Sequence, residues 1–302
     1  MLDVCLLGTG GMMPLPKRWL TSLMCRAEGS NILIDCGEGT QIAMKEKGWS
    51  PKSIDAILFT HFHADHISGL PGILLSIANA ERTEPLLLVG PKGLPRVCDA
   101  LRVIAPELPF DVQYHELPPE GEMLKIGAFQ IDAFKVNHKI TCYGYRVSIP
   151  RLAKFEVEKA KANNVPLPAW NLLQHGQIVE MDGIRYTPDM VMGEARRGLT
   201  VIYCTDTRPT DKIAEMATDA DLFICEGMYG DPEKLTNAKK NRHMMMQEAA
   251  ELGQRAKPKE MWFTHYSPAE AKPEIYRDEI QKIWPVKFAR DGWSKNLEFT
   301  DD

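Results

Sequence analysis

The sequence contains no apolar run long enough to cross a bilayer, and its first residues lack the basic and apolar regions of a secretory signal peptide. Its seven cysteines are odd in number, scattered and without a C-x-x-C pair, which argues against a disulfide framework and against a thiolate zinc site. Because several of them lie in apolar, strand-like runs, we expect reduced and buried thiols in a cytoplasmic protein that does not associate with membranes.

An excess of basic charge is also missing. The 36 Lys and Arg residues and the 41 Asp and Glu residues leave a net charge of −5, which argues against broad nonspecific binding of nucleic acid but allows a local basic patch. The run Gly8-Thr9-Gly10-Gly11 lacks the third glycine of a dinucleotide-binding loop, because Met13 occupies that position. The remaining composition, 44% hydrophobic and 25% charged over 302 residues, is that of an ordinary globular protein.

What the sequence does contain is a dense cluster of metal ligands, Thr60-His61-Phe62-His63-Ala64-Asp65-His66, directly after the apolar run 54–59. On an extended backbone His61 and His63 point to one side, and Asp65 and His66 follow where the chain turns toward a helix-like stretch at 68–77. Imidazole and carboxylate without thiolate suit Zn²⁺, with Mn²⁺ or Fe²⁺ as alternatives. Two such ions about 3.5–4 Å apart can clamp a phosphoryl or acyl centre, so the cluster predicts hydrolysis.

Three more strand-like runs lead to a possible ligand, namely 127–138 to His138, 199–204 to Asp206 and 260–264 to His265. In layered α/β folds the ends of strands converge on one rim, so we expect these side chains to join the first cluster, with Asp206 as the bridging carboxylate. His115 and His175 have no such context and are expected on the surface or in loops.

The chain is expected to form one domain over residues 1–302. Residues 151–198 differ in character from the rest: they begin with a charged, helix-favouring segment at 155–162 and continue through Pro166 and Pro168 with little apolar periodicity. We interpret them as an excursion inserted into the core rather than as a second domain.

Together these motifs resemble the metallo-β-lactamase superfamily, and more closely the ribonuclease Z family of tRNA 3′-processing endonucleases. The resemblance covers nearly the whole chain. Its pieces are Gly8 to Gly10, Pro14 to Ser22, Asp35 to Gln41, His61 to Gly72, His138 with Tyr143 to Arg146, Thr205 to Arg208, Glu226, His243 with Glu248 to Ala250, and Thr264-His265. The runs Asp35 to Gln41 and Ser68 to Gly72 are more specific than the metal motif that many members of the superfamily share.

The resemblance implies a four-layer αβ/βα sandwich with two central mixed sheets and helices outside. It implies two Zn²⁺ ions per subunit, one held by His61, His63 and His138, the other by Asp65, His66 and His265, with Asp206 shared. Asp65 would also orient or deprotonate the attacking water. His243 would be the general acid for the leaving 3′ oxygen, held by Glu226. The family also implies a homodimer, in which an arm of one subunit presents RNA to the site of the other.

The sequence departs from the family at its substrate side. Pro166-Leu167-Pro168-Ala169-Trp170 stands where the arm of the family carries a Gly-Pro element, Trp19 stands where Asn is usual, and Met244-Met245 where small hydroxyl residues are usual. Four basic residues are candidate phosphate contacts, against the alternative of solvated surface charge: Lys17, Arg18, Arg151 and Lys154.

The expected function is zinc-dependent removal of 3′ trailers from tRNA precursors. One alternative is hydrolysis of a small phosphodiester or ester on the same scaffold, which a pocket closed by Trp19, Trp170 or the methionines would favour. Another is a metal-binding interaction protein without catalysis, which the complete ligand set disfavours.

Overall fold

The computed structural model describes residues 1–300, which form two compact units. The larger comprises residues 1–149 and, as far as the structure describes them, residues 199–300, and the smaller comprises residues 150–198. Among the described residues there is no helix whose length and apolar character would let it span a membrane.

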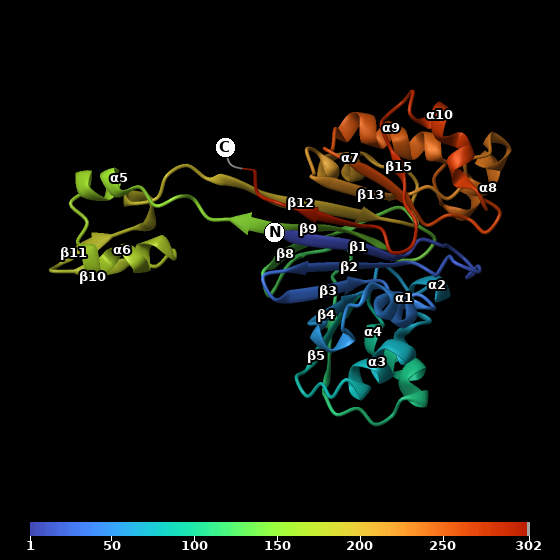
Figure 1. Cartoon of the computed structure of the whole chain (residues 1–302), viewed down its shortest axis with the longest axis horizontal. Coiled ribbons are helices and arrows are strands. Elements are labelled where there is room, and N and C mark those ends of the chain that lie inside the picture. Colours follow the sequence, from blue (N-terminus) through green and yellow to red (C-terminus); the bar gives the residue numbers. More distant parts are fainter. Residues whose placement is uncertain (301–302) are drawn as a thin grey trace. The chain divides into compact units, whose positions relative to one another are not determined.

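Two seven-stranded sheets form the centre of the larger unit (Figure 1). The first has the order β16-β1-β2-β3-β4-β5-β6. Its strands are β1 (Leu2–Gly8), β2 (Ser22–Ala27), β3 (Ser30–Ile34), β4 (Ala56–Leu58), β5 (Leu86–Gly90), β6 (Val112–Glu116) and β16 (Ser294–Leu297). Pairing is antiparallel from β16 to β3 and parallel from β3 to β6, so the sheet is mixed.

The second sheet has the order β15-β14-β13-β12-β9-β8-β7. Its strands are β7 (Met123–Ile126), β8 (Phe129–Lys135), β9 (Tyr143–Arg151), β12 (Arg196–Cys204), β13 (Leu222–Glu226), β14 (Met261–Thr264) and β15 (Lys287–Phe288). Pairing is antiparallel among β7, β8 and β9 and parallel from β12 to β15. His115, which we expected on the surface or in a loop, lies in the edge strand β6 with its side chain 40% exposed, and its Nε2 is 2.5 Å from Glu122 Oε1.

Helices cover the outer face of each sheet in the larger unit. They are α1 (Thr40–Lys47), α2 (Ala64–Ile67), α3 (Leu70–Asn79), α4 (Leu94–Leu101), α7 (Asp211–Ala217), α8 (Leu235–Asn241), α9 (Met246–Ala256) and α10 (Arg277–Ile280). Short 3₁₀ turns are η1 (Pro51–Ser53), η2 (Arg102–Ile104), η4 (Pro232–Lys234) and η5 (Pro273–Tyr276). Helices α1, α3 and α4 pack on the first sheet, and α7, α9 and α10 pack on the second.

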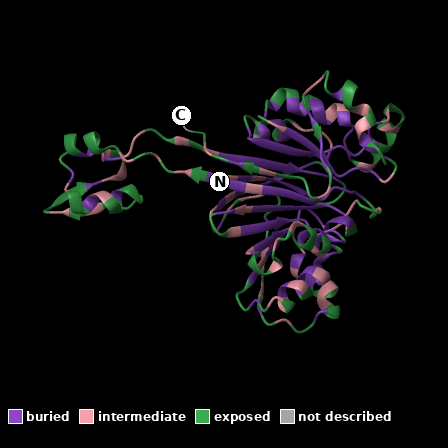
Figure 2. Cartoon of the chain, viewed as in Figure 1, coloured by how far each residue is buried: buried purple, intermediate pink, exposed green. Residues whose placement is uncertain are grey.

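Alternation along the strands explains the four layers. In β1, Leu2, Val4 and Leu6 belong to the core between the sheets, whereas Cys5 and Leu7 point to the core under the helices. Both faces of the central strands are therefore buried, as their purple colour shows in Figure 2. The predicted four-layer sandwich of two mixed sheets with helices outside is confirmed.

One carboxylate contacts side chains from both sheets. Glu260 accepts a hydrogen bond from Lys287 of β15 at 2.8 Å and one from Lys295 of β16, which belongs to the other sheet. Trp262 Nε1 donates to the same carboxylate at 2.5 Å. Partial burial favours the neutral acid, but these donors outweigh it and lower the pKa of Glu260 to about 2.

The smaller unit has its own apolar core despite its weak sequence periodicity. Its elements are α5 (Val157–Ala162), α6 (Leu167–Gln174), β10 (Val179–Met181), β11 (Ile184–Tyr186) and η3 (Pro188–Met190). Strands β10 and β11 form an antiparallel pair. Ala160, Ala169 and Leu173 from the two helices pack with Tyr186 and Val191.

Candidate metal centre

Three of the four ligand-bearing segments leave the two sheets at the carboxyl ends of parallel strands. His61 and His63 follow β4, and helix α2 then carries Asp65 and His66. From the second sheet come Asp206, two residues beyond β12, and His265, directly after β14. His138 follows β8 and completes the set. All seven predicted ligands are therefore brought together, in groups whose ligand atoms lie within 4.8 Å of one another.

Backbone conformation helps to aim two of these residues. Asp206 and His265 have φ values of 53° and 55°, which lie in the left-handed region that residues other than glycine rarely adopt. Such strain persists only where the surrounding structure holds it, and it concentrates at functional sites. Gly11 provides the space for His265, because a Cβ atom at position 11 would lie 2.7 Å from its imidazole Cε1.

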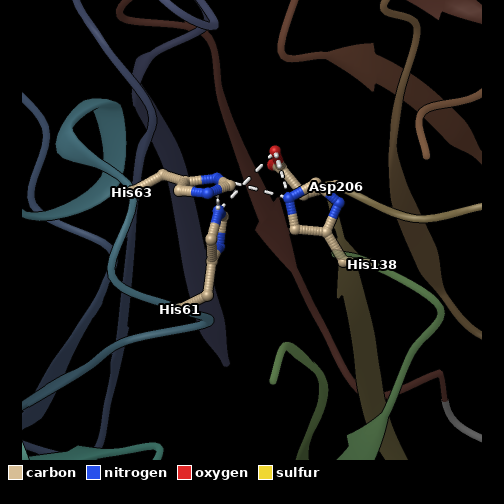
Figure 3. A group of neighbouring side chains, drawn as sticks. All are labelled: His61, His63, His138 and Asp206. Atoms are coloured by element: carbon tan, nitrogen blue, oxygen red, sulfur yellow. Dashed lines mark hydrogen bonds and ion pairs between the residues drawn. The ribbon is translucent and has the colours of Figure 1, made fainter. Parts of the chain in front are cut away.

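The first group consists of three imidazoles and one carboxylate oxygen (Figure 3). His63 Nδ1 lies 2.9 Å from His61 Nε2 and 3.3 Å from His138 Nε2. Asp206 Oδ1 faces the same point, at 3.7 Å from His61 Nε2 and 3.9 Å from His138 Nε2. Three imidazole nitrogens and one carboxylate oxygen converging in this way form a suitable cage for a four-coordinate Zn²⁺.

The second group lies on the other side of Asp206. His66 Nε2 and His265 Nε2 are 3.2 Å apart, and Asp65 Oδ2 is 3.6 Å from the first and 3.3 Å from the second. Asp206 Oδ2 lies 3.0 Å from His66 Nε2 and 3.1 Å from His265 Nε2. The two oxygens of Asp206 thus face different groups, as a bridging carboxylate requires.

The buried oxygen Asp206 Oδ2 has no hydrogen-bond partner although these nitrogens surround it. A buried carboxylate oxygen without a donor is costly, and a cation between it and the imidazoles would remove that cost. The donor set and this orphaned atom both fit a metal ion.

The far side of two imidazoles, those of His66 and His138, is held as metal-ligating histidines usually are. His66 Nδ1 is 2.8 Å from Asp35 Oδ2, and Asp35 also accepts hydrogen bonds from the backbone N–H and the hydroxyl of Thr60. His138 Nδ1 lies 3.3 Å from the carbonyl oxygen of Arg242. These contacts leave Nε2 of both rings directed into the cluster. Asp35 and Thr60 were not predicted as site residues, although Asp35 lies in the motif 35–41.

Burial and charge divide the imidazoles by protonation state. Burial lowers the pKa of His61, His63 and His138, which keeps these imidazoles neutral and able to ligate a metal. Burial alone would do the same to His66, but the surrounding carboxylates outweigh it and raise its pKa well above the ordinary value. These carboxylates are Asp206, Asp35 and Asp65. The centre of the cluster is therefore electronegative and favours a cation.

His243 lies beside the metal groups and is paired with Glu226. Its Nδ1 is 3.0 Å from Glu226 Oε2 and 3.8 Å from Asp206 Oδ1. Burial favours the neutral ring, but Glu226 and the nearby aspartates outweigh burial and raise the pKa of His243 to about 9. Glu226 is fully buried at the end of β13, and its other oxygen accepts the backbone N–H of Thr207 at 2.6 Å.

Residues 243–245 precede helix α9, which begins at Met246. Arg208 holds this segment: its Nη1 donates to the carbonyl of His243 at 2.6 Å and to Glu248 Oε2 at 2.9 Å. Arg208 and Glu248 were recognised only as motif residues. Their role in fixing the backbone of His243 becomes visible in the structure alone.

The predicted phosphate contacts lie in both units. Arg18 donates to the carbonyls of Glu270 and Ala271 at 2.9 and 3.0 Å, and the neighbouring Lys17 is exposed. Arg151 ends strand β9, and Lys154 is an exposed residue of the smaller unit.

The large side chains that might have closed a pocket are packed elsewhere. The Trp19 ring contacts the backbone of Gly39, and Trp170 packs on Phe155 with ring centroids 5.1 Å apart. Met244 and Met245 are buried in apolar clusters. The contacts of these side chains thus give the small-ester alternative no support.

Comparison with known proteins agrees with this geometry. The family model described as Metallo-beta-lactamase superfamily matches residues 21–151. A protein named Ribonuclease Z from Lachnospira eligens is 59% identical over the full length of both chains. Another of the same name from Lachnoclostridium phytofermentans is 56% identical over 99% of each.

Solved structures share the fold at low identity. Human tRNase Z, short form, superposes with a TM-score of 0.69 at 23% identity, covering 98% of this chain and 99% of that one. The metallo-beta-lactamase fold protein YhfI from Bacillus subtilis superposes with the same TM-score at 18% identity, covering 97% and 98%.

Proposed function

Because the chain belongs to the ribonuclease Z family of the metallo-beta-lactamase superfamily, we propose that its imidazole and carboxylate cluster is a two-zinc centre that removes 3′ trailers from tRNA precursors. The protein is a metal-dependent endoribonuclease of this family. The position of Asp206 carries the proposal, since its two oxygens face separate groups of imidazole nitrogens at 3.0–3.9 Å.

The ligands proposed for the first ion are His61, His63 and His138, and those for the second are Asp65, His66 and His265, with Asp206 shared. Zinc is favoured because the donors are imidazole and carboxylate. Cys142 lies beside His61, but burial raises the pKa of its thiol well above the ordinary value, so it does not compete as a thiolate ligand. When bound, two divalent cations supply Lewis-acid activation of water and of the phosphoryl group.

Asp65 is the residue proposed to orient the attacking water and accept its proton. Its Oδ2 accepts the backbone N–H of Met12 at 2.7 Å, which fixes the carboxylate within the second group. The surrounding imidazoles outweigh its burial and hold the pKa of Asp65 well below its ordinary value, so the carboxylate is ionised.

His243 is proposed as the general acid. With Nδ1 donating to Glu226, the proton on Nε2 is the one available to the leaving 3′ oxygen of the ribose. A ribose alkoxide is a poor leaving group, and a positioned imidazolium typically accelerates its departure by about 10²–10⁴. Glu226 keeps the ring charged and oriented.

The cellular compartment, the tRNA contacts and the oligomeric state are further parts of the proposal. The seven free, buried cysteines support a reducing compartment, which we take to be the cytoplasm. The smaller unit, residues 150–198, is proposed as the arm that contacts tRNA, through residues such as Arg151 and Lys154, while Lys17 and Arg18 would contact phosphates nearer the metal centre. A homodimer is proposed from the family resemblance, and size-exclusion chromatography with light scattering tests it.

The test of function is cleavage of a trailer-bearing tRNA precursor by the zinc-loaded protein. We expect cleavage after the discriminator base with a 3′ hydroxyl on the tRNA. Hydrolysis of a simple bis-aryl phosphodiester without any cut in the precursor would reject tRNA as substrate while retaining the phosphodiesterase centre. The inactive variant Asp206→Ala controls for contaminating nucleases.

A further inference from the structure

A cavity of about 490 Å³ beside the metal centre is lined by cations and by no carboxylate. Its charged side chains are Lys135, Lys139, Lys212 and Arg242, and the proposed zinc ligand His138 also lines it. The chain as a whole carries a net charge of −5, so a cavity lined by four cationic side chains and no carboxylate differs in charge from the protein as a whole. A concave site of one sign of charge concentrates ligands of the opposite sign.

A second cavity of about 420 Å³ provides the contrast. It also has four cationic lining residues, but Glu274 and Asp291 line it too. Arg290 in that cavity pairs with Glu274 at 2.7 Å. Carboxylates within that cavity therefore offset part of its cationic charge, whereas no carboxylate lines the cavity beside His138.

Two of the four cations beside His138 have only neutral partners among the described residues. Lys139 Nζ donates to Asn241 Oδ1 at 3.0 Å. Arg242 Nη1 donates to the carbonyl of His138 at 2.6 Å and to Asn137 Oδ1 at 3.3 Å. Neither pairs with a carboxylate in residues 1–300, so an anion entering the cavity would meet charge that is not already neutralised.

The other two cations are held by weak surface pairs. Lys135 lies 3.0 Å from Glu120, and Lys212 lies 2.8 Å from Glu215. The two glutamate side chains are 81% and 68% exposed. Exposed pairs of this kind contribute little, so both lysines can turn toward an incoming anion at small cost.

Arg242 fixes the position of the cavity relative to the proposed metal centre. It and His138 exchange two contacts, from Arg242 Nη1 to the carbonyl of His138 and between His138 Nδ1 and the carbonyl of Arg242. Arg242 also has a φ of 59°, a conformation that the fold must hold in place. An anion bound by this guanidinium therefore stands at a set position beside the ligand.

We propose that this cavity is a subsite for a backbone phosphate of RNA that neighbours the scissile phosphate. The subsite rests on the proposed function, because it assumes an RNA substrate at the metal centre. The subsite also determines the position of cleavage. The phosphate bound by Lys139, Lys212 and Arg242 sets which phosphodiester of the RNA lies between the two proposed groups of metal ligands. The bound phosphate belongs either to the tRNA or to the trailer, and substrate length distinguishes the two.

The experiment compares the full-length, zinc-loaded protein with Lys139→Ala/Lys212→Ala. Both side chains are exposed, so the variant is expected to fold, and Arg242 is left intact because it supports His138. Lys92→Ala/Lys282→Ala is the matched control, since these lysines are also exposed and lie outside the cavity. A charge-preserving variant, Lys139→Arg/Lys212→Arg, separates the loss of charge from the loss of the side chain.

Binding of a tRNA precursor is measured by fluorescence anisotropy across a salt series, and cleavage by single-turnover kinetics. For the alanine pair we expect Kd to rise about 3- to 30-fold and the slope of log K against log salt to fall by about 1–2. We expect the arginine pair and the control pair to match the wild type. A simple bis-aryl phosphodiester, which has no second phosphate, should be hydrolysed equally by all four proteins.

The outcomes separate the two levels of the proposal. If the wild type does not cut the precursor, the proposed function is rejected. The salt dependence of RNA binding, compared between the wild type and the alanine pair, still tests the cavity in that case. A wild type that cuts, together with an alanine pair whose Kd and slope equal those of the control pair, rejects the subsite. If the defect disappears when the trailer is cut to one nucleotide, the bound phosphate belongs to the trailer. If it persists, the phosphate belongs to the tRNA.

Discussion

Replacing His243 by Asn tests whether this residue donates a proton to the leaving group. The imidazole lies 3.0 Å from Glu226 and 3.8 Å from Asp206, and it is outside the two proposed ligand sets. The variant should therefore keep its bound zinc while losing the acid. The expected loss in kcat on a tRNA precursor is about 10²–10⁴, equivalent to about 2.7–5.4 kcal/mol of barrier.

The leaving group provides the internal control. An aryl phosphodiester releases an acidic phenol that departs without protonation, so His243→Asn should hydrolyse it with less than about a tenfold loss. Single-turnover rates on both substrates, with zinc content measured on the same samples, give the comparison. Equal losses on the two substrates, or loss of zinc in the variant, would refute the general-acid role and assign His243 to the support of the metal centre.

Three further predictions follow from buried contacts. Glu226→Gln removes the charge that keeps His243 protonated, so its loss on the precursor should be about 10–100-fold, smaller than that of His243→Asn. Gly11→Ala places a Cβ atom 2.7 Å from the ring of His265 and should weaken zinc affinity measurably in a competition titration with a chelator. Glu260→Gln should lower the free energy of unfolding at pH 7 by about 1–3 kcal/mol in a urea titration. Because the folded-state pKa of Glu260 is depressed to about 2, this difference should persist above about pH 4.5 and vanish as the pH falls toward 2.

Each of these has an outcome that contradicts it. A Glu226→Gln variant slower than His243→Asn would mean that the carboxylate acts on more than the imidazole. Unchanged zinc affinity in Gly11→Ala would show that the loop around residue 11 moves to accommodate the methyl group and leaves the ring of His265 in place. A pH-independent effect of Glu260→Gln would assign the loss of stability to packing rather than to charge.

The grouping of the candidate ligands was predictable because these residues follow strands. His61, Asp206 and His265 each follow an apolar, strand-like run. Because the carboxyl ends of parallel strands meet at one edge of a sheet, this pattern predicts that the three side chains lie close together. The four-layer fold followed from the family resemblance.

What escaped prediction depends on contacts between distant residues. The bond from Arg208 to the carbonyl of His243 joins positions 35 residues apart, and the contact of Arg242 with His138 joins positions 104 apart. The sequence shows only a basic residue in a loop at each site. Likewise, the cationic cavity forms because the segment after β8, the start of α7 and the end of α8 meet. A local sequence pattern does not show that such distant segments meet.

Because the proposed ligands come from both sheets, their division has a consequence for the folding of the protein. Residues 61–66 leave one sheet, whereas Asp206 and His265 leave the other, and each proposed ion takes donors from both. Neither half of the sandwich carries all the donors of either proposed ion, so we expect metal binding to require that both sheets are folded and docked in register. Metal affinity is then expected to report on correct assembly of the two halves.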